Sequence, residues 1–467
     1  MVDRDNAYLT DLLQSIADRS RRWFSRNFDY AASTGTTPEL LAQALLSTRG
    51  EASGVALARV IVDRWDHMNK DERLNWFSML ADDFGPSVST LQAAVDAWMA
   101  DHSPITASKL HAAAEPRRQE LLRRINLAPN GTATLVKMRE FLLLHINGDP
   151  GLNAVDADFA HLFGSWFNRG FLLLHRIDWS SPADILERII RYEAVHEIRN
   201  WNDLRGRLKP VDRRCFAFFH PQMPDEPLIF VEVALTKGMP AEIGGLLAED
   251  RTALADSEAD TAVFYSISNT QAGLKGISFG NFLIKQVVEE LLRELPGLRT
   301  FVTLSPIPGF AVWLAGQVKP SSDNEPAKID GALLAALSEP GWHMNPETRD
   351  HVQPALERAA ATYLLKAKSG GGKPADPVAR FHLHNGARLE RINYCGDIST
   401  KGLKQSHGMM VNYLYDLDLI EQNHELYSNA CEVAASGTVR KLLSADNQTS
   451  LTRNIQSLLR TKKELPK

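Results

Sequence analysis

The hydrophobic pattern of this chain changes near residue 180, and that change limits the folds that are open to it. Before this point, apolar residues recur every three or four positions, as they do along one face of an α-helix. One example is the series Trp65, Met68, Leu74, Phe77 and Leu80. After this point, short runs rich in Phe, Val, Ile and Tyr are bounded by Pro, Gly and Asp, as strands usually are. The sequence therefore predicts a helical domain followed by a domain built on a sheet.

Helical periodicity predicts six helices in the first third of the chain. They are expected at Asn6–Ala17, Pro38–Leu46, Glu51–Trp65, Asp71–Ala81, Val88–Met99 and Ala107–Ile125. No cluster of residues here resembles a site, so we expect this part to serve packing or oligomerisation. The pentapeptide Phe-Leu-Leu-Leu-His occurs at 141–145 and again at 171–175. Its flanks do not repeat, and a solenoid needs at least three units, so the repetition is taken as coincidence.

The second part of the chain has the pattern of a sheet covered by helices. Strands are expected at Cys215–His220, Leu228–Leu235, Ala262–Ser268, Thr300–Leu304 and Leu389–Tyr394. An amphipathic helix at Asn281–Leu295 separates the third strand from the fourth, which predicts a βαβ-like unit. The predicted fold class is α/β: an all-helical bundle over residues 1–170, then an α+β domain with a mixed central sheet over 171–467. A helical insertion is expected at about 325–368.

Composition excludes several functional classes. With 44% hydrophobic and 23% charged residues among 467, the chain is not largely disordered. Its net charge of −5 has no basic excess, so we expect no nucleic-acid partner. Three widely spaced cysteines indicate a reducing compartment and neither a disulfide framework nor a thiolate zinc site. No apolar run approaches the roughly 20 residues that span a bilayer, and no targeting signal is evident, so we expect a cytoplasmic protein without membrane contact.

A glycine-containing loop lies between a predicted strand and the helix at Asn281. It contains Gly273, Gly276 and Gly280. Glycines before a helix let backbone amides approach an anion, and the helix dipole adds to the attraction, so a phosphate or pyrophosphate fits here. The spacing matches neither a Walker loop nor a dinucleotide-binding loop. A plain turn is the alternative interpretation.

Three segments carry side chains suited to catalysis. Ser305 follows a strand and precedes two prolines that fix the backbone, at the edge of a sheet where ligands bind; a turn or cap is the alternative. His382 and His384, if on a strand, would face one side, as two metal ligands do. No third ligand has suitable spacing, so we predict no metal and favour a single catalytic histidine tuned near neutrality. Asn412 and Tyr415 lie in a last expected strand, where core packing is the alternative role.

Several long motifs, in order, make the chain resemble the malonyl-CoA decarboxylase family. The resemblance is dense from about 165 to 415 and more diffuse in the N-terminal helices. The motifs are Arg191-Tyr-Glu-Ala-Val-His-Glu-Ile, Asn200-Trp-Asn-Asp-Leu, Arg213-Arg-Cys-Phe, Phe264-Tyr-Ser-Ile-Ser-Asn-Thr-Gln-Ala-Gly-Leu, Leu304-Ser-Pro-Ile-Pro-Gly-Phe and Phe381-His-Leu-His-Asn-Gly-Ala.

The resemblance implies a helical domain used in assembly of a homo-oligomer, a dimer or tetramer, and a catalytic domain with the GNAT acetyltransferase fold. It implies that Ser305 and His382 are the catalytic pair and that Asn412 and Tyr415 belong to the site wall. It also implies that a loop before the central helix holds the coenzyme A pyrophosphate with backbone amides. Here that loop is Lys275, Gly276, Ile277, Ser278, Phe279, Gly280 and Asn281, with serine at 278 where acetyltransferases have glycine.

The implied reaction converts malonyl-CoA to acetyl-CoA and carbon dioxide without a cofactor, because coenzyme A is part of the substrate. We expect His382 to donate to the developing enolate and to supply or relay a proton, and Ser305 to orient the malonyl group. One alternative is a GNAT-type N-acyltransferase, which would release free coenzyme A when an amine is present. Another is a non-catalytic protein that only binds acyl-CoA.

Overall fold

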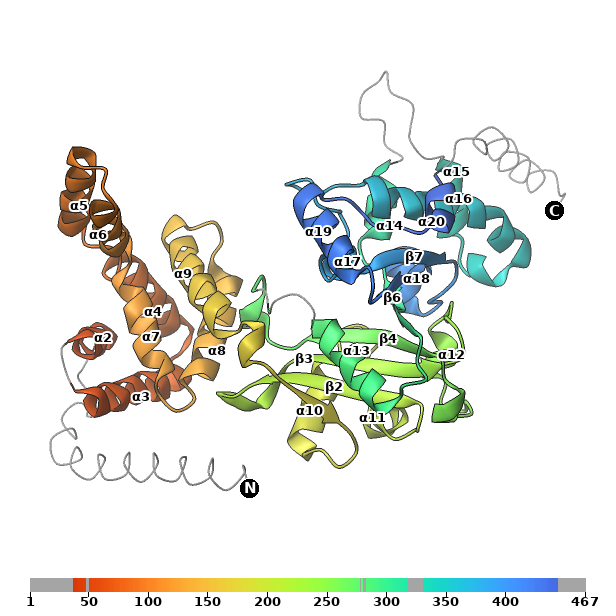
Figure 1. The fold of residues 1–467 in the computed structure, drawn as a ribbon, viewed down its shortest axis with the longest axis horizontal. Helices are drawn as coiled ribbons and strands as arrows, with labels where there is room; N and C mark the ends of the chain where they lie inside the picture. The colour runs from red at the N-terminus through yellow and green to blue at the C-terminus, as the bar shows by residue number, and fades with distance from the viewer. Residues whose placement is uncertain (1–36, 48–49, 278, 280–282, 318–330, 444–467) are drawn as a thin grey trace, which may run out of the picture. The chain divides into compact units, whose positions relative to one another are not determined.

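The computed structural model describes residues 37–47, 50–277, 279, 283–317 and 331–443. They form two compact units (Figure 1). The first unit contains the chain up to Leu172, the hairpin tip His220–Glu226 and the segment Gln271–Phe279. The second unit contains the rest. The helix predicted at Asn6–Ala17 lies outside the described residues.

The first unit is helical, as the periodicity predicts. Its helices are α2 (Pro38–Leu46), α3 (Glu51–His67), α4 (Lys70–Asp82), α5 (Val88–Ala100), α6 (Pro104–Ala114), α7 (Arg117–Asn126), α8 (Gly131–His145) and α9 (Pro150–Trp166), followed by the 3-10 turn η1 (Arg169–Phe171). The single helix expected at Ala107–Ile125 is wrong, because the chain breaks between α6 and α7. Pro116 lacks an amide hydrogen and disfavours a helical backbone at Glu115, which ends α6.

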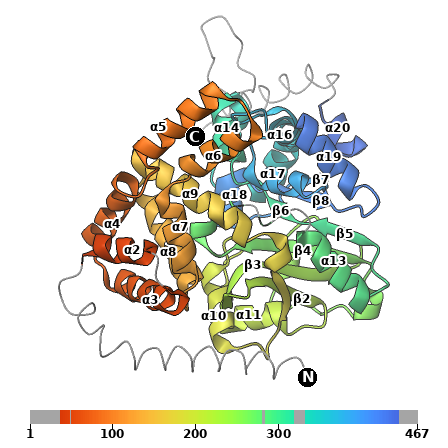
Figure 2. The same ribbon diagram turned by 60° about the vertical axis from the view of Figure 1, so that its left-hand side comes forward.

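Aromatic rings fill the core of the helical unit, where α3, α4, α8 and α9 meet (Figure 2). Phe77 lies at the centre of this cluster: it contacts Trp65 edge-on at 5.6 Å, stacks on Phe141 at 6.1 Å and tilts against Phe159 at 6.4 Å between ring centroids. Phe77 and Trp65 are almost completely buried. Large rings that pack in offset and edge-on geometries contribute more to stability than their buried area alone.

The second unit is built on an eight-stranded sheet with the order β1-β2-β3-β4-β5-β8-β6, in which β7 also pairs with β8. The strands are β1 (Leu173–Ile177), β2 (Arg213–His220), β3 (Met223–Thr236), β4 (Thr261–Asn269), β5 (Thr300–Thr303), β6 (Ser305–Pro306), β7 (Arg388–Asn393) and β8 (Met410–Leu414). The β4–β5 pair is parallel, whereas β1–β2, β3–β4 and β7–β8 are antiparallel. The predicted mixed sheet is therefore confirmed.

Helices cover the two faces of the first strands. The helices α10 (Ala183–Tyr192) and α11 (Trp201–Leu208) pack against the side chains of β1 to β3 that include Cys215 and Ala217. Side chains alternate along a strand, so the neighbouring Arg214 points to the other face. There Arg214 forms an ion pair with Glu294 at the end of α13 (Leu283–Glu294). The helix expected at Asn281–Leu295 is thus present over its described residues.

The pairing between β4 and β5 covers only the first part of β4. Thr261–Phe264 pairs with β5, and the other edge of β5 pairs with β8 through Val302 and Leu414. Among the described residues, no strand pairs with the rest of β4, Tyr265–Asn269, on this edge.

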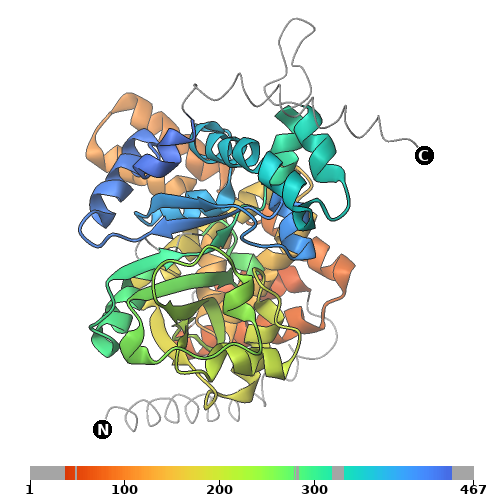
Figure 3. The same ribbon diagram turned by 90° about the vertical axis from the view of Figure 1, so that its right-hand side faces the viewer.

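Most of the remaining helices belong to the second half of the second unit, where α16, α17 and α20 lie against β7 and α19 packs on α17 (Figures 2 and 3). The remaining elements are α12 (Gly244–Leu247), η2 (Asp256–Glu258), η3 (Ala272–Leu274, within the first unit), α14 (Phe310–Gln317), α15 (Gly331–Ser338), η4 (Trp342–Met344), α16 (Pro346–Lys366), α17 (Pro377–His384), α18 (Thr400–Ser406), α19 (Ile420–Ala430) and α20 (Gly437–Lys441). The elements α15, η4 and α16 occupy the predicted helical insertion.

His382 and His384 lie on helix α17, so their placement on a strand was wrong. Asp376 accepts a hydrogen bond from the amide of Ala379, and Pro377 follows it at the first helical position. An aspartate cap followed by proline is a typical helix start, and it outweighs the strand-like alternation of the next residues. In the part of the chain that the structure describes, no helix is long and apolar enough to cross a membrane.

Candidate active site

Ser305 and His382 are 77 positions apart in the sequence, and the fold brings their side chains together. The Oγ atom of Ser305 lies 3.1 Å from Nε2 of His382, and both residues are buried. Ser305 lies on the short strand β6, where it pairs with Val411 of β8. His382 lies in the last turn of α17, so strand pairing fixes one partner and a capped helix fixes the other.

The turn after α17 holds this helix against its neighbours. Gly386 has a φ of 80°, in the left-handed region that favours glycine. A Cβ atom at this position would lie 2.1 Å from the carbonyl oxygen of Ile420, so no larger residue fits. The amide of Ala387 donates to the carbonyl of His382 at 3.0 Å, which fixes the backbone beside the imidazole.

Two tyrosines, Tyr413 of β8 and Tyr415 directly after this strand, surround the imidazole of His382. The hydroxyl oxygen of Tyr415 lies 2.8 Å from Nδ1, on the side of the ring opposite to Ser305. The ring of Tyr413 stacks on the imidazole, with 4.6 Å between centroids and 25° between planes. The imidazole is therefore held at both nitrogens and on one face.

Thr303 completes a chain of hydrogen bonds and indicates where the protons lie. Ser305 Oγ donates to Thr303 Oγ1 at 2.9 Å. A hydroxyl has a single proton, so Nε2 of His382 must carry a hydrogen and donate to Ser305. Nδ1 then accepts from the Tyr415 hydroxyl. The network thus assigns the tautomer: donation runs from Tyr415 to His382 to Ser305 to Thr303.

Burial makes this site electrically neutral. It lowers the pKa of His382 to about 3, and burial is the only cause that acts on this group. Burial alone also raises the pKa of Tyr415. Any nearby carboxylate or cation would act on these groups as well. The imidazole is therefore uncharged at neutral pH. The expectation of a histidine with a pKa near neutrality is wrong, because burial removes water from the ring and disfavours its charged form.

Asn412 is fully buried, and its amide is occupied by protein partners. Its Nδ2 donates to the carbonyl of Thr303 at 2.7 Å, and its Oδ1 accepts from Asn393 at 2.8 Å and from Arg391 at 3.1 Å. Asn412 therefore ties the strand that precedes Ser305 to β7 and β8. Thr303, Arg391, Asn393 and Tyr413 are not among the site residues expected from the sequence. The signal available was position: Thr303 is two residues from Ser305, and Tyr413 is two from Tyr415.

The predicted pyrophosphate loop is described only in part. Ser278, Gly280 and Asn281 lie outside the described residues. Lys275 and Gly276 are exposed, and Ile277 and Phe279 are partly buried. Gly276 has a φ of 79° and open space around the position of a Cβ atom, so a glycine is needed here for its backbone conformation.

Comparison with known proteins identifies the family. The model of the malonyl-CoA decarboxylase C-terminal domain matches residues 170–453, and that of the N-terminal domain matches residues 84–167. The chain belongs to the malonyl-CoA decarboxylase family. The sequence-based prediction of a malonyl-CoA decarboxylase is confirmed.

Relatives and solved structures agree with this assignment. The chain is 37% identical over 360 residues to the mitochondrial malonyl-CoA decarboxylase of the goose Anser anser anser, covering 72% of this chain and 71% of the relative. It resembles the crystal structure of malonyl-CoA decarboxylase from Rhodopseudomonas palustris, at a TM-score of 0.81 and 57% identity over 86% of this chain and 98% of the other. The enzyme from Agrobacterium vitis matches at a TM-score of 0.83 and 55% identity, over 88% and 100%. GNAT-like domains match at TM-scores of 0.31 and 0.29, too distantly to add to the assignment.

The two histidines of α17 do not form a metal site with each other. His384 lies beside His424, with 5.1 Å between ring centroids, whereas His382 faces the serine. Within the described ranges, no group of three or more His, Cys, Asp or Glu side chains is arranged to hold a metal ion.

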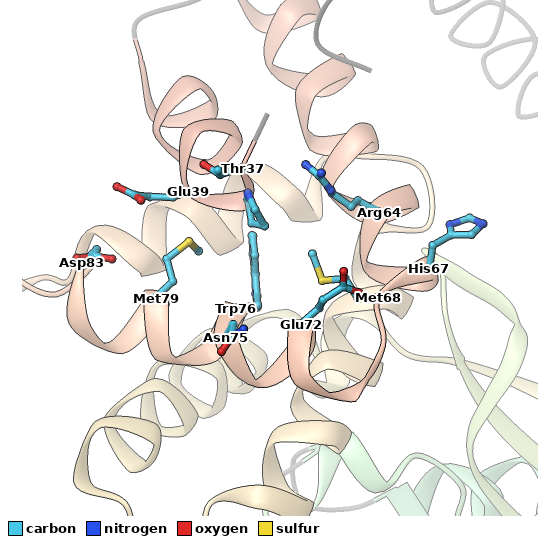
Figure 4. Close-up of a pocket in the computed structure, with 11 residues that line it drawn as sticks. Thr37, Glu39, Arg64, His67, Met68, Glu72, Asn75, Trp76, Met79 and Asp83 are labelled. Atoms are coloured by element: carbon cyan, nitrogen blue, oxygen red, sulfur yellow. The ribbon is translucent and has the colours of Figure 1, made fainter. Parts of the chain in front are cut away.

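The helical unit contains a cavity of about 520 Å³ that lies between α2, α3 and α4 (Figure 4). The side chain of Trp76 rises from α4 toward the start of α2, with Met68 and Met79 on either side of it. None of the residues singled out in the sequence as site candidates lines this cavity.

Proposed function

We propose that Ser305 and His382 are the catalytic pair with which this chain converts malonyl-CoA to acetyl-CoA and carbon dioxide. The observation that carries the proposal is the buried, uncharged hydrogen-bond chain Tyr415–His382–Ser305–Thr303. This chain places one oriented N–H donor, that of His382, next to one hydroxyl, that of Ser305. Their hydrogen bonds run within the chain, from Tyr415 to Thr303.

In the first step, the bond between the malonyl carboxylate carbon and the α-carbon breaks. Its electron pair moves toward the thioester carbonyl, and an enolate forms as carbon dioxide leaves. The Nε2–H of His382 leaves Ser305 and donates to the thioester oxygen as negative charge develops there. A neutral imidazole suits this role, since it donates a hydrogen bond without a net charge of its own.

Ser305 hydrogen-bonds the malonyl group and holds its carboxylate out of the plane of the thioester. The breaking carbon–carbon bond is then parallel to the π orbitals of the thioester carbonyl, which receive its electron pair. The neutral surroundings favour the same step. The side chains that contact Ser305 and His382, namely Thr303, Tyr413 and Tyr415, are uncharged. A carboxylate that enters such a site loses hydration, whereas carbon dioxide is neutral and loses little.

The enolate then takes up one proton at the α-carbon, which gives acetyl-CoA. Burial keeps His382 from holding a second proton, so the proton comes from solvent and is relayed by the hydroxyl and imidazole groups. This balances the reaction: malonyl-CoA and one proton give acetyl-CoA and carbon dioxide.

Coenzyme A binding is assigned to backbone groups. The amides of the loop from Lys275 to Asn281 bind the pyrophosphate. The pantetheine arm, which carries two amides, pairs with the unpaired edge of β4. The amide of Thr270 bonds to Leu228 of β3, and alternation along the strand then turns the polar groups of Ile267 and Asn269 toward the unpaired edge.

Tyr415 and Asn412 receive positioning roles in this proposal. Tyr415 fixes the tautomer of His382, and Asn412 fixes the strand before Ser305, because its amide is fully engaged by protein. The reaction as written needs no cofactor. Assembly into a homo-oligomer through the helical part stays a prediction, as do the domain limits at residues 170 and 171. Cytoplasmic location also stays a prediction, and the goose and mouse relatives are named mitochondrial.

The activity is tested by incubating the purified protein with malonyl-CoA and a chelator, without amine, and following acetyl-CoA and carbon dioxide. The proposal expects both products in equal amounts. Release of free coenzyme A only when an amine is added would instead indicate an N-acyltransferase. Binding of malonyl-CoA without turnover would indicate a protein that only binds acyl-CoA.

A further inference from the structure

The loop assigned to the coenzyme A pyrophosphate is held by a buried arginine of the helical unit. Residues 271–279 belong to the same compact unit as α8. From α8, Nη1 of Arg139 donates to the carbonyl oxygens of Gly273 at 2.8 Å and Lys275 at 2.9 Å. Its Nε donates to Oδ1 of Asp156 at 2.7 Å, and Arg139 is only 4% exposed. One guanidinium thus links α8, α9 and the loop.

Close packing supports the same contact. A Cβ atom at Gly273 would lie 2.0 Å from the carbonyl oxygen of Val136 on α8. No L-residue with a side chain fits at this distance, so the start of the loop lies directly against the helix. The sequence pattern places Gly273 in a possible anion-binding loop, whereas the structure gives this glycine a packing role.

The carbonyl of Lys275 determines where the next amide points. In a trans peptide, the C=O of one residue and the N–H of the next point in opposite directions. Because the carbonyl of Lys275 points at Arg139, the N–H of Gly276 points away from α8. Gly276 is exposed, and its N–H has no hydrogen-bond partner among the described residues.

The backbone N–H groups next to Gly276 already donate hydrogen bonds within the loop, whereas that of Gly276 does not. The amide of Leu274 donates to Gln271 at 3.0 Å, that of Lys275 to Ala272 at 3.1 Å, and that of Ile277 to Leu274 at 3.0 Å. In the stretch from Leu274 to Ile277, the described structure therefore offers one outward backbone donor, which is next to the exposed side chain of Lys275.

We propose that Arg139 is a positioning residue for the coenzyme A pyrophosphate, acting through the Lys275–Gly276 peptide. Its charge is buried and paired with Asp156, so it acts on the loop and not on the ligand. By fixing this peptide plane before the substrate arrives, it removes the cost of orienting the Gly276 amide on binding. The inference rests on the proposed role of the loop, and it gives the helical part of the chain a function in substrate affinity.

The test compares two substrates, malonyl-CoA and malonyl-pantetheine, which lacks the pyrophosphate and the nucleotide. Arg139→Gln should raise the KM for malonyl-CoA roughly tenfold, the effect of weakening one hydrogen bond to a charged group. The kcat should stay within twofold, and so should the KM for malonyl-pantetheine. Because KM does not depend on the fraction of folded enzyme, partial unfolding of the variant does not imitate this result.

Arg118→Gln is the matched control. Arg118 is equally buried in the helical unit, pairs with Asp158, and donates to the carbonyl of Leu80 instead of the loop. It should leave both KM values within twofold. If Arg139→Gln yields no folded protein, Arg139→Lys is measured in the same way, since it retains the charge beside Asp156.

The outcomes separate this inference from the proposed function. Equal KM values for the two substrates in the wild type would show that the pyrophosphate is not bound, which overturns the loop's role and this inference together. A wild type that prefers malonyl-CoA, with an Arg139 variant that keeps the full preference, would overturn this inference alone. A rise of both KM values by the same factor would also overturn it, because that indicates a general structural role.

Discussion

The Nδ1 atom of His382 lies 2.8 Å from the hydroxyl oxygen of Tyr415. Because Ser305 donates to Thr303, Nδ1 must be the accepting nitrogen, and Tyr415 must be the donor. Tyr415 therefore keeps the hydrogen of the imidazole on Nε2, the atom that faces Ser305. The chemistry proposed for this chain depends on that one tautomer, and several measurable consequences result.

Replacing Tyr415 by Phe removes the donor to Nδ1 and retains the ring. The other tautomer then becomes available, and Nε2 loses its hydrogen in a fraction of molecules. We expect kcat for malonyl-CoA to fall about 10- to 100-fold with little change in KM, measured by steady-state release of acetyl-CoA. Tyr427→Phe, on α19 and outside this hydrogen-bond chain, is the control and should keep wild-type rates. A similar loss in both variants would argue against the tautomer role.

Replacing Thr303 by Val keeps the shape of the side chain and removes the acceptor of the Ser305 hydroxyl. The serine proton is then free to point at His382, which disturbs the donor order of the chain. We expect kcat to fall about tenfold. Thr303→Ser retains the hydroxyl and should recover most of the activity. If the Val and Ser variants behave alike, the hydroxyl of Thr303 has no part in orienting Ser305.

The low pKa of His382 predicts a specific loss of stability in acid. In the unfolded chain an ordinary histidine, with a pKa near 6.5, takes up a proton as the pH falls, whereas folded His382 stays neutral down to about pH 3. The unfolded state therefore binds more protons between these values, and this residue lowers the free energy of unfolding as the pH falls. The expected slope is about 1.4 kcal/mol per pH unit.

The slope is measured by urea unfolding at several pH values between 4 and 6.5. His382→Asn lacks the titrating group and should show a shallower dependence than the wild type. Other buried groups, such as Asp376, are common to both proteins and cancel in the comparison. Parallel curves for the two proteins would mean that folded His382 titrates near its ordinary pKa.

Replacing Asn412 by Ala distinguishes support from substrate contact. The change removes the bonds that join Asn412 to Thr303, Asn393 and Arg391 and leaves buried polar partners unpaired. We expect the free energy of unfolding to fall by about 3 kcal/mol. Asn345→Ala, which removes only the cap of α16, should cost about 1 kcal/mol. A stable Asn412→Ala protein with a raised KM would instead favour direct contact with the substrate.

Local signals allowed much of the fold to be predicted. Helical periodicity located α2 to α5, and β-type runs located β2 to β5, because burial of one face produces these patterns directly. The pentapeptide at 141–145 and 171–175 shows the limit of such signals. It is helical within α8, yet at its second occurrence it leaves a 3-10 turn and enters β1. The surrounding tertiary structure, and not the pentapeptide itself, decides between helix and strand at each occurrence.

The site was less predictable than the fold. Ser305 and His382 were identified through a resemblance, and nothing local indicated that they meet, because helix packing and strand pairing across 77 residues bring them together. The neutral state of His382 was also missed. It results from complete burial without a nearby charge, which depends on the whole surrounding structure. The role of Arg139 was invisible for the same reason, since its carbonyl partners lie more than 130 positions away.

The most direct test of the central claim is the rate of carbon dioxide release from malonyl-CoA in a single turnover, with His382→Asn compared with the wild type. The amide of Asn is too short to reach the position of Nε2, so the donor to the enolate is lost. The account predicts a fall of roughly 100- to 1,000-fold, the usual cost of removing a donor to a developing oxyanion. A folded variant that binds malonyl-CoA and releases carbon dioxide within a few-fold of the wild-type rate would contradict it.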